Sequence, residues 1–228
     1  MKVLYLTQSS TLDFFYDFHN NSKLFKKAAY LVNDSDYYQS FLKKHPSFEK
    51  ENNIFKDWDL KSDKETIDKA FLTEIESDYF QSTVLKAVNI DRRLVGGIKS
   101  TYIQSYENIF SDDDLLKKFQ VSFKEISKFI NKYKPDLIIG FICVTLSEYL
   151  AFHIAKKKNI NYFNLRPSRI KNRFFVVRDI HDPPMSLIND FNLNIFDKKI
   201  NSESKSIIQE LKKDFSYEGV ISNSKDNL

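Results

Sequence analysis

Cysteine, glycine and proline are all scarce in this chain of 228 residues, with one, four and five occurrences respectively. The single cysteine, Cys143, excludes a disulfide framework and a thiolate metal cluster. Because it lies in the apolar run LIIGFICV, we interpret Cys143 as a small buried hydrophobic residue. No apolar run approaches the length of a membrane span, and the N-terminus lacks a signal-peptide pattern. These absences predict a cytoplasmic protein without a transmembrane segment.

The scarcity of glycine argues against two common nucleotide-binding devices. The segment that follows the first predicted strand, QSST, contains no glycine. A dinucleotide-binding G-x-G-x-x-G turn and a Walker A loop both require glycines at that position. We therefore set aside nicotinamide-dependent dehydrogenases and P-loop nucleotide hydrolases, and we predict no cofactor.

Metal ligands show no recognisable pattern. The four histidines have no ligand spacing with one another or with Cys143. Three D-x-D pairs, at 34/36, 57/59 and 112/114, resemble the carboxylate pairs that hold a metal-bound sugar nucleotide. A chain rich in aspartate produces such pairs by chance, and Asp34 and Asp36 are also explained as caps of a helix that begins near Tyr37. We predict no metal site.

Apolar and charged residues are both abundant. Hydrophobic residues make up 42% of the chain and aromatic residues 15%, which is enough to build a sizeable core. The 35 basic and 31 acidic residues are interspersed and leave a formal net charge of +4. This balance is too mild to indicate nucleic-acid binding, and we predict no nucleic-acid partner. A role at RNA or an anionic membrane would need the lysines gathered on one face, whereas the densest run, 156–158, is explained by a helix C-terminus.

Strand-like and helix-like segments alternate along the chain. Short β-rich runs occupy residues 2–7, 27–34, 135–141, 160–166 and 173–179. The first run is almost wholly apolar, as expected of a strand covered on both faces of a parallel sheet. Amphipathic stretches with capping residues follow several of these runs. The alternation predicts an α/β, Rossmann-like fold, with a largely parallel sheet and helices on both faces.

The middle third of the chain departs from this alternation. No convincing strand pattern is present from 48 to 133, where helical periodicity recurs. In its last part, 112–133, the apolar residues are spaced to form one stripe along a helix. We predict a helical insertion at 48–133 that ends in a crossover helix. The insertion belongs to a single Rossmann-like domain over 1–215, followed by a polar tail at 216–228.

Candidate site residues follow from this fold class. In an open parallel sheet, ligands bind at the carboxyl ends of the strands, near the point where the strand order reverses. The segments that follow the predicted strands are therefore the places to search for a site. We predict substrate-binding positions at Gln8, Ser9, Ser10, Thr145, Glu148, Arg166, Ser168 and Arg169. The sequence identifies no catalytic residue.

Thr145 and Glu148 form a helix-capping signature. The tetrapeptide Thr145-Leu-Ser-Glu148 matches the capping box S/T-x-x-E, so a helix is expected to start directly after the strand at 135–141. Its first amide groups would then point toward the ligand-binding edge of the sheet. Glu148 is explained either as a capping residue or as a ligand for a substrate hydroxyl.

The segment LRPSRI at 165–170 places two arginines at the end of a predicted strand. Arg166 ends the strand, Pro167 stops further pairing, and Arg169 follows within a short turn. We predict that both guanidinium groups and the amides of the Thr145 helix form one anion site, because guanidinium groups suit phosphate and carboxylate. In the alternative, one arginine pairs with Glu148 or Asp179 and the other faces solvent.

Several segments resemble bacterial capsule and surface-polysaccharide biosynthesis proteins of the glycosyltransferase-B type. They are the strand PDLIIGF, the capped helix with Glu148, the segment AKKKNINYFNLRPSRI and the strand RFFVV. The segment NIDRRLVGG, residues 89–97, also resembles one that these proteins carry before their crossover helix. The resemblance implies an N-terminal, acceptor-side domain that takes part in sugar transfer from a nucleotide donor onto a growing glycan.

Proteins of this type have a second Rossmann-like domain that supplies most of the nucleotide-sugar site, and 228 residues leave no room for it. The resemblance therefore implies a glycosyltransferase that is inactive until a second glycosyltransferase domain completes it. A glycan acceptor or a sugar nucleotide is the expected partner. The alternative is a non-catalytic glycan- or nucleotide-binding module that uses the same strand-end cleft.

Overall fold

The computed structural model describes residues 1–80, 82–95, 110–168, 174–181, 185–193 and 198–213. The chain divides into two compact units, Met1–Phe163 and Asn164–Leu228. We call them the N-terminal unit and the C-terminal unit. The predicted tail at 216–228 and Arg169 lie outside the described residues.

The sheet has six strands in the order β3-β2-β1-β4-β5-β6. The strands are β1 (Lys2–Thr7), β2 (Lys27–Val32), β3 (Asn53–Lys56), β4 (Leu137–Phe141), β5 (Asn161–Pro167) and β6 (Phe174–Val177). β1 pairs in parallel with both β2 and β4, β2 pairs in parallel with β3, and β6 runs antiparallel to β5. The predicted α/β, Rossmann-like fold with a largely parallel sheet is confirmed.

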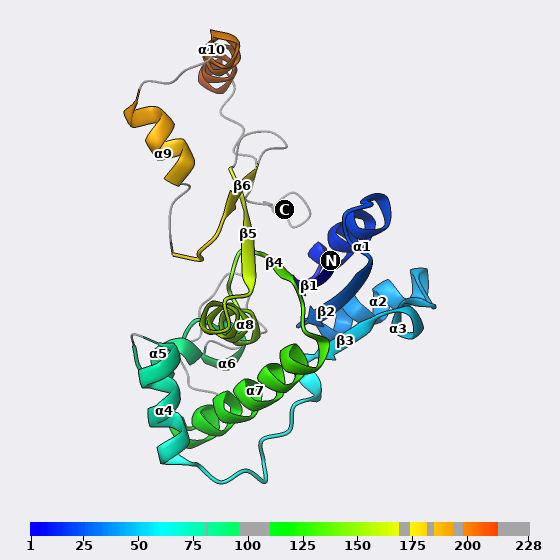
Figure 1. The fold of residues 1–228 in the computed structure, drawn as a ribbon, viewed down its shortest axis with the longest axis vertical. Helices are drawn as coiled ribbons and strands as arrows, with labels where there is room; N and C mark the ends of the chain where they lie inside the picture. Colours follow the sequence, from blue (N-terminus) through cyan, green and yellow to red (C-terminus); the bar gives the residue numbers. More distant parts are fainter. Residues whose placement is uncertain (81, 96–109, 169–173, 182–184, 194–197, 214–228) are drawn as a thin grey trace, which may run out of the picture. The chain divides into compact units, whose positions relative to one another are not determined.

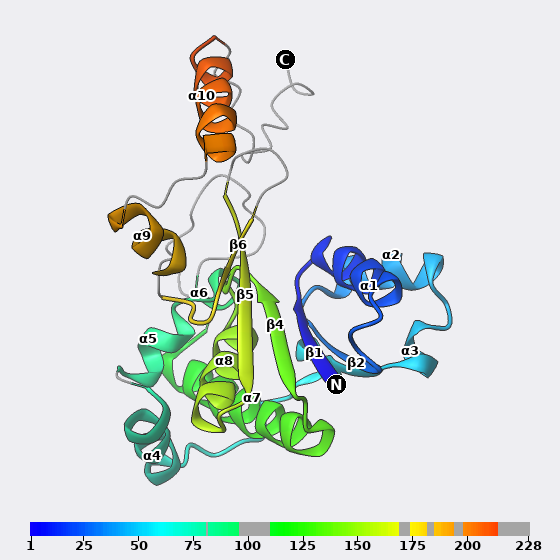
Figure 2. The same cartoon turned by 45° about the horizontal axis from the view of Figure 1, so that its top comes forward.

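Helices lie between the strands and after β6. They are α1 (Thr11–Asn21), α2 (Ser35–Lys44), α3 (Phe48–Glu51), the 3-10 helix η1 (Asp57–Asp59), α4 (Lys69–Tyr79), α5 (Val84–Val88), α6 (Arg92–Val95), α7 (Asp112–Tyr133), α8 (Leu146–Lys157), α9 (Met185–Asn192) and α10 (Lys198–Lys213). Figure 1 shows α1 and α2 on one side of β1 and β2, with α7 and α8 on the other. Figure 2 shows β1 between β4 and β2. No described helix is long and apolar enough to cross a membrane.

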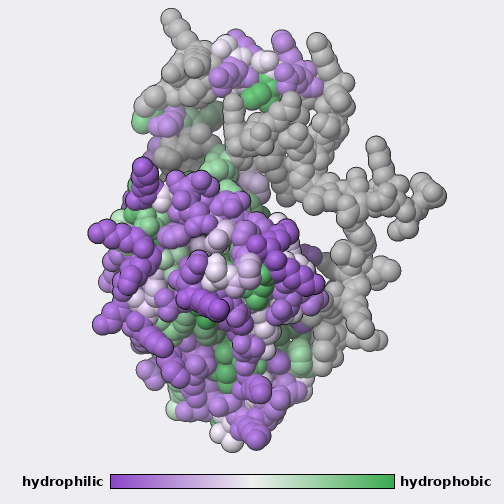
Figure 3. Space-filling model, turned by 90° about the vertical axis from the view of Figure 1, so that its right-hand side faces the viewer, coloured by the Kyte–Doolittle hydropathy of each residue, from purple (hydrophilic) through white to green (hydrophobic). Residues whose placement is uncertain are grey.

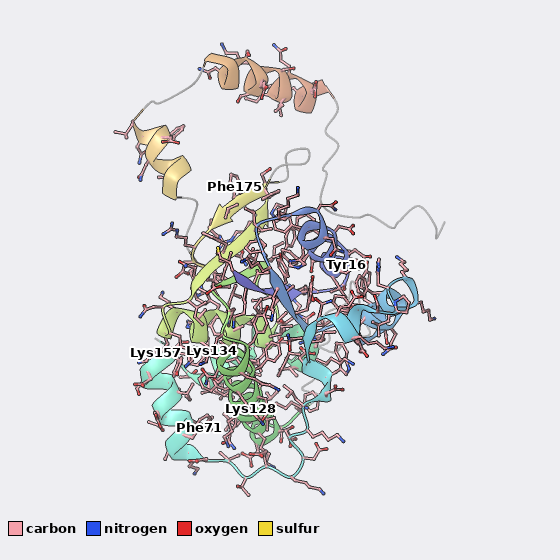
Figure 4. The ribbon with its side chains drawn as sticks, turned by 45° about the vertical axis from the view of Figure 1, so that its right-hand side comes forward. Tyr16, Phe71, Lys128, Lys134, Lys157 and Phe175 are labelled. Atoms are coloured by element: carbon pink, nitrogen blue, oxygen red, sulfur yellow. The ribbon has the colours of Figure 1, made fainter. Side chains whose placement is uncertain are left out.

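Aromatic side chains fill the core between the sheet and its first two helices. Tyr5 and Tyr30 are register partners on β1 and β2, and both are completely buried. The ring of Tyr5 stacks on Phe15 of α1, with ring centroids 4.9 Å apart. Tyr16, labelled in Figure 4, packs against Phe41 and other rings between α1 and α2. The described residues on the face drawn in Figure 3 are mostly hydrophilic, as expected outside such a core.

Helix α7 is the predicted crossover helix, and it begins and ends where the sequence predicted. It buries one apolar stripe and packs against α8. A capping box at its start fixes the boundary, because Ser111 and Asp114 exchange side-chain bonds to backbone amides.

α8 is joined to α4 by Lys157, labelled in Figure 4, whose Nζ lies 3.5 Å from Oδ2 of Asp78.

Two expectations about the strands and the cysteine are wrong. Residues 48–133 contain the strand β3, which pairs in parallel with β2. This strand has only four residues, Asn53–Lys56, and lies at the edge of the sheet. It is therefore too short to show the apolar pattern by which a strand is recognised in the sequence. Cys143 is only half-buried, because β4 ends at Phe141 and the cysteine lies in the loop that follows.

In the C-terminal unit, Arg166 lies on the β5–β6 pair. Its guanidinium group donates to the carbonyl oxygen of Asp179, at 3.1 Å, and to that of Ile180. Its Nε donates to Oδ1 of Asn164 at 3.3 Å. Helix α9 (Met185–Asn192) lies further along the same unit.

Candidate functional site

A cleft of about 1190 Å³ lies in the N-terminal unit at the carboxyl ends of β1, β2, β3 and β4. The strand order reverses at β1, because β2 and β3 extend from one side of it and β4 lies on the other. Ligand sites of open α/β sheets form where the order reverses in this way. The loop after each of these strands contributes to the lining, through Gln8, Asn33, Asp57 and Val144 respectively.

Glu148 joins two of these loops beneath the cleft. Oε2 of Glu148 accepts a 2.7 Å hydrogen bond from Nε2 of Gln8, after β1. The same oxygen accepts the amides of Val144 and Thr145, each at 3.2 Å, and the hydroxyl of Thr145 at 2.9 Å. The predicted capping box is therefore present at the start of α8.

A salt-bridge cluster of one half-buried arginine and two aspartates joins the other loops. The guanidinium group of Arg93 lies 2.9 Å from Oδ2 of Asp57 and 2.6 Å from Oδ2 of Asp91, and it also donates to the carbonyl oxygen of Asn33. Asp91 in turn accepts the first amide of α8, from Leu146, at 3.0 Å. Because buried carboxylates need charged partners, Arg93 stabilises both aspartates in this position.

Hydroxyl groups connect Glu148 to this cluster. Thr145 Oγ1 accepts a 3.1 Å bond from Nδ2 of Asn33 and lies 3.3 Å from Oγ of Ser147. Ser147 then donates to Oδ2 of Asp57 at 3.1 Å. A continuous polar network therefore surrounds the N-terminus of α8 and holds all four strand-end loops.

The carboxyl group of Glu148 is buried, and its two oxygens differ in their hydrogen bonding. Only 1% of the residue is exposed, and within the described chain Oε1 has no hydrogen-bond partner, although Oε2 has four. Burial raises the pKa of Glu148 to about 7, against the opposing effect of its hydrogen bonds to Gln8, Val144 and Thr145. Burial also raises the pKa of Asp57, against the opposing effect of Arg93. A pKa of about 7 predicts that Glu148 gains or loses its proton near neutral pH.

Backbone strain is present on both sides of the strand-order reversal. Ser9, after β1, has φ 41°, and Ile142, after β4, has φ 46°. A β-branched residue such as Ile142 rarely adopts positive φ, and non-glycine residues in this region cost free energy. Strain of this kind is common at ligand sites, and here it occurs on the two loops that Glu148 joins.

The structure brings together part of the predicted substrate-binding set. Gln8, Ser9 and Thr145 line the cleft, and Glu148 lies beneath it, bonded to Gln8. Ser10 is the N-cap residue of α1. Arg166 and Ser168 belong to the C-terminal unit, and Arg169 lies outside the described residues. The single anion site that was predicted to combine them with the Thr145 helix stays a prediction.

Several amides at the start of the Thr145 helix, which that anion site was expected to use, already have protein partners. Glu148 accepts those of Val144 and Thr145, and Asp91 accepts that of Leu146. Three residues of the network, Asp57, Asp91 and Arg93, were not predicted as site residues. The sequence signals available for them were the second D-x-D pair and the segment NIDRR. No group of three or more His, Cys, Asp or Glu suited to a metal ion is found within the described ranges.

Comparisons with known proteins include a distant structural similarity. No known protein family matches the chain, and no curated protein matches it. Among solved structures, the chain resembles the crystal structure of UDP-GlcNAc 2-epimerase from Neisseria meningitidis bound to UDP-GlcNAc, with a TM-score of 0.35 and 9% sequence identity. The match covers 76% of this chain and 33% of the epimerase chain, so this chain spans about a third of that protein's length.

Proposed function

We propose that the N-terminal unit binds a glycan acceptor in the strand-end cleft and serves as the acceptor-side half of a glycosyltransferase-B type enzyme of surface-polysaccharide biosynthesis. The observation that carries this proposal is the occupation of three amides at and just before the start of α8: Glu148 accepts those of Val144 and Thr145, and Asp91 accepts that of Leu146. In nucleotide-binding Rossmann-like folds, free amides at a helix N-terminus on the strand-end edge of the sheet receive a phosphate group. Here they are bonded to carboxylates of the protein, which favours a ligand without phosphate.

The charge of the cleft supports the same interpretation. Among the described residues, its lining contains the carboxylates of Asp34, Asp36, Asp57 and Asp91 and two cations, Arg92 and Arg93. A pyrophosphate group would meet net negative charge in this cleft, whereas the hydroxyl groups of a sugar hydrogen-bond to carboxylates without a charge penalty. The donor nucleotide would then be bound by a second domain.

The single tryptophan of the chain provides the test, because Trp58 lines the cleft. The purified chain is titrated with neutral oligosaccharides such as maltose, cellobiose and lactose, and separately with UMP and UDP, while tryptophan fluorescence is recorded. The proposal expects a saturable change with at least one saccharide and none with the nucleotides. Saturable binding of UDP with no saccharide response would contradict it.

A further inference from the structure

Most polar groups of the cleft are already bonded within the protein. Gln8 donates to Glu148, Ser9 donates to Asp34, and Asn33 donates to Thr145. Asp34 also accepts the amide of Tyr37 as the N-cap of α2, and the hydroxyl of Tyr37 donates to Asp13. Asp57, Asp91 and Arg93 are held by the salt-bridge cluster. These groups hold the shape of the cleft and have little remaining capacity for a ligand.

Four lining residues have side-chain polar groups that are not bonded to any described residue. They are Ser35, Asp36, Trp58 and Arg92. Ser35 and Asp36 lie in the first turn of α2, Trp58 lies on η1, and Arg92 is the first residue of α6. We call them the ligand-facing set.

The ligand-facing set contains both hydrogen-bond donors and acceptors, and both signs of charge. Asp36 supplies a carboxylate acceptor, Arg92 and the indole N–H of Trp58 supply donors, and the Ser35 hydroxyl can do both. Its one negative and one positive charge cancel. The net negative charge of the cleft therefore lies on Asp34, Asp57 and Asp91, which are already bonded within the protein. A ligand that both donates and accepts hydrogen bonds and carries no net charge fits this set.

Trp58 adds a rigid apolar surface. Its ring lies against Tyr38, with ring centroids 5.6 Å apart, and Tyr38 is completely buried and donates to Glu49 at 2.8 Å. The indole is half-buried and is therefore held in place before a ligand arrives. An amphipathic ring of this kind binds a ligand that has an apolar face and polar edges, as a sugar ring has.

From these observations we infer that Ser35, Asp36, Trp58 and Arg92 form a binding subsite for a neutral sugar residue, with the ring against Trp58 and adjacent hydroxyls shared between Asp36 and Arg92. This subsite rests on the proposed function and assigns its ligand contacts to residues other than Gln8, Ser9, Thr145 and Glu148. Those four residues shape the cleft, and the ligand-facing set binds.

The test compares Asp36→Asn and Arg92→Gln with two controls of the same chemistry outside the cleft, Asp59→Asn and Lys44→Gln. Asp59 is exposed on η1 and Lys44 is exposed at the end of α2, and neither is among the described residues that line the cleft. Affinity for the saccharide that responds best is measured by Trp58 fluorescence, and circular dichroism checks the fold of every variant.

Each cleft variant is expected to raise the Kd about tenfold or more, since a hydrogen bond to a charged group is lost, whereas the controls keep the wild-type Kd. If a saccharide binds both cleft variants as tightly as the wild type, the subsite is wrong and the proposed function stands. A tighter response to galacturonic or glucuronic acid than to neutral sugars would overturn the neutral-ligand assignment. If no saccharide binds the wild type, the proposed function itself fails.

Discussion

Replacing Glu148 with glutamine should remove a pH dependence of folding stability that this one residue creates. Burial raises the pKa of Glu148 from its ordinary 4.5 to about 7 in the folded chain. Between these pH values the folded state holds a proton that the unfolded state has lost, so stability falls as pH rises. At about 1.4 kcal/mol per pKa unit, wild type should lose roughly 3 kcal/mol across this window through Glu148 alone. The loss is complete above pH 7.

The assay is urea denaturation of wild type and Glu148→Gln at pH 4.5, 5.5, 6.5 and 7.5. The glutamine amide does not titrate, so the difference in unfolding free energy between the two proteins should shift by roughly 3 kcal/mol in favour of the variant as pH rises. At every pH the variant should also be less stable than wild type by about 1–3 kcal/mol, because its new amide group replaces Oε1 in a buried position without an acceptor. Other titrating groups are common to both proteins and cancel in the difference.

Glu74→Gln is the matched control, because Glu74 is exposed on α4 and belongs to no part of the network. It should keep the wild-type dependence on pH. Parallel pH profiles for wild type and Glu148→Gln would refute the reasoning, because they would show that the buried carboxyl group has the same pKa in the folded and unfolded chain.

Three further predictions concern the network, a helix cap and activity. Arg93→Ala should lower the unfolding free energy by about 3–5 kcal/mol in chemical denaturation, because it leaves the carboxylates of Asp57 and Asp91 buried without a counter-charge. A loss below about 1 kcal/mol would show that water solvates the cluster. Asp34→Ala should lower the unfolding free energy by about 1 kcal/mol through the lost cap of α2, and no change would mean that the bond to Tyr37 contributes nothing. The purified chain should release no nucleotide from a panel of sugar nucleotides, with or without metal, and steady release would show that no second domain is needed.

Elements with local signals could be predicted from the sequence. The extent of α7 was predicted from its apolar periodicity, and the start of α8 was predicted from the capping box of Thr145 and Glu148. β3 was missed because a four-residue edge strand buries too little to impose an apolar pattern. The region of the cleft was predicted because parallel strands place their carboxyl ends at one edge.

Contacts between distant segments could not be predicted. Arg93 meets Asp57 across 36 residues of sequence, and Asp91 meets the amide of Leu146 across 55. No periodicity or capping rule links such positions, so the amides of α8 were expected to be free for an anion. The bond between Gln8 and Glu148 was not predicted for the same reason, since it joins loops 140 residues apart.

The most direct test of the account is a two-dimensional ¹H–¹⁵N NMR titration of the chain with the neutral saccharide that gives the strongest fluorescence response. Trp58 is the only tryptophan, so its indole N–H resonance is identified without further assignment. The account predicts saturable shifts of that resonance and of the amides of Ser35, Asp36 and Arg92, with the same Kd. Saturable shifts confined to the C-terminal unit around Arg166, with the Trp58 resonance unchanged, would contradict it.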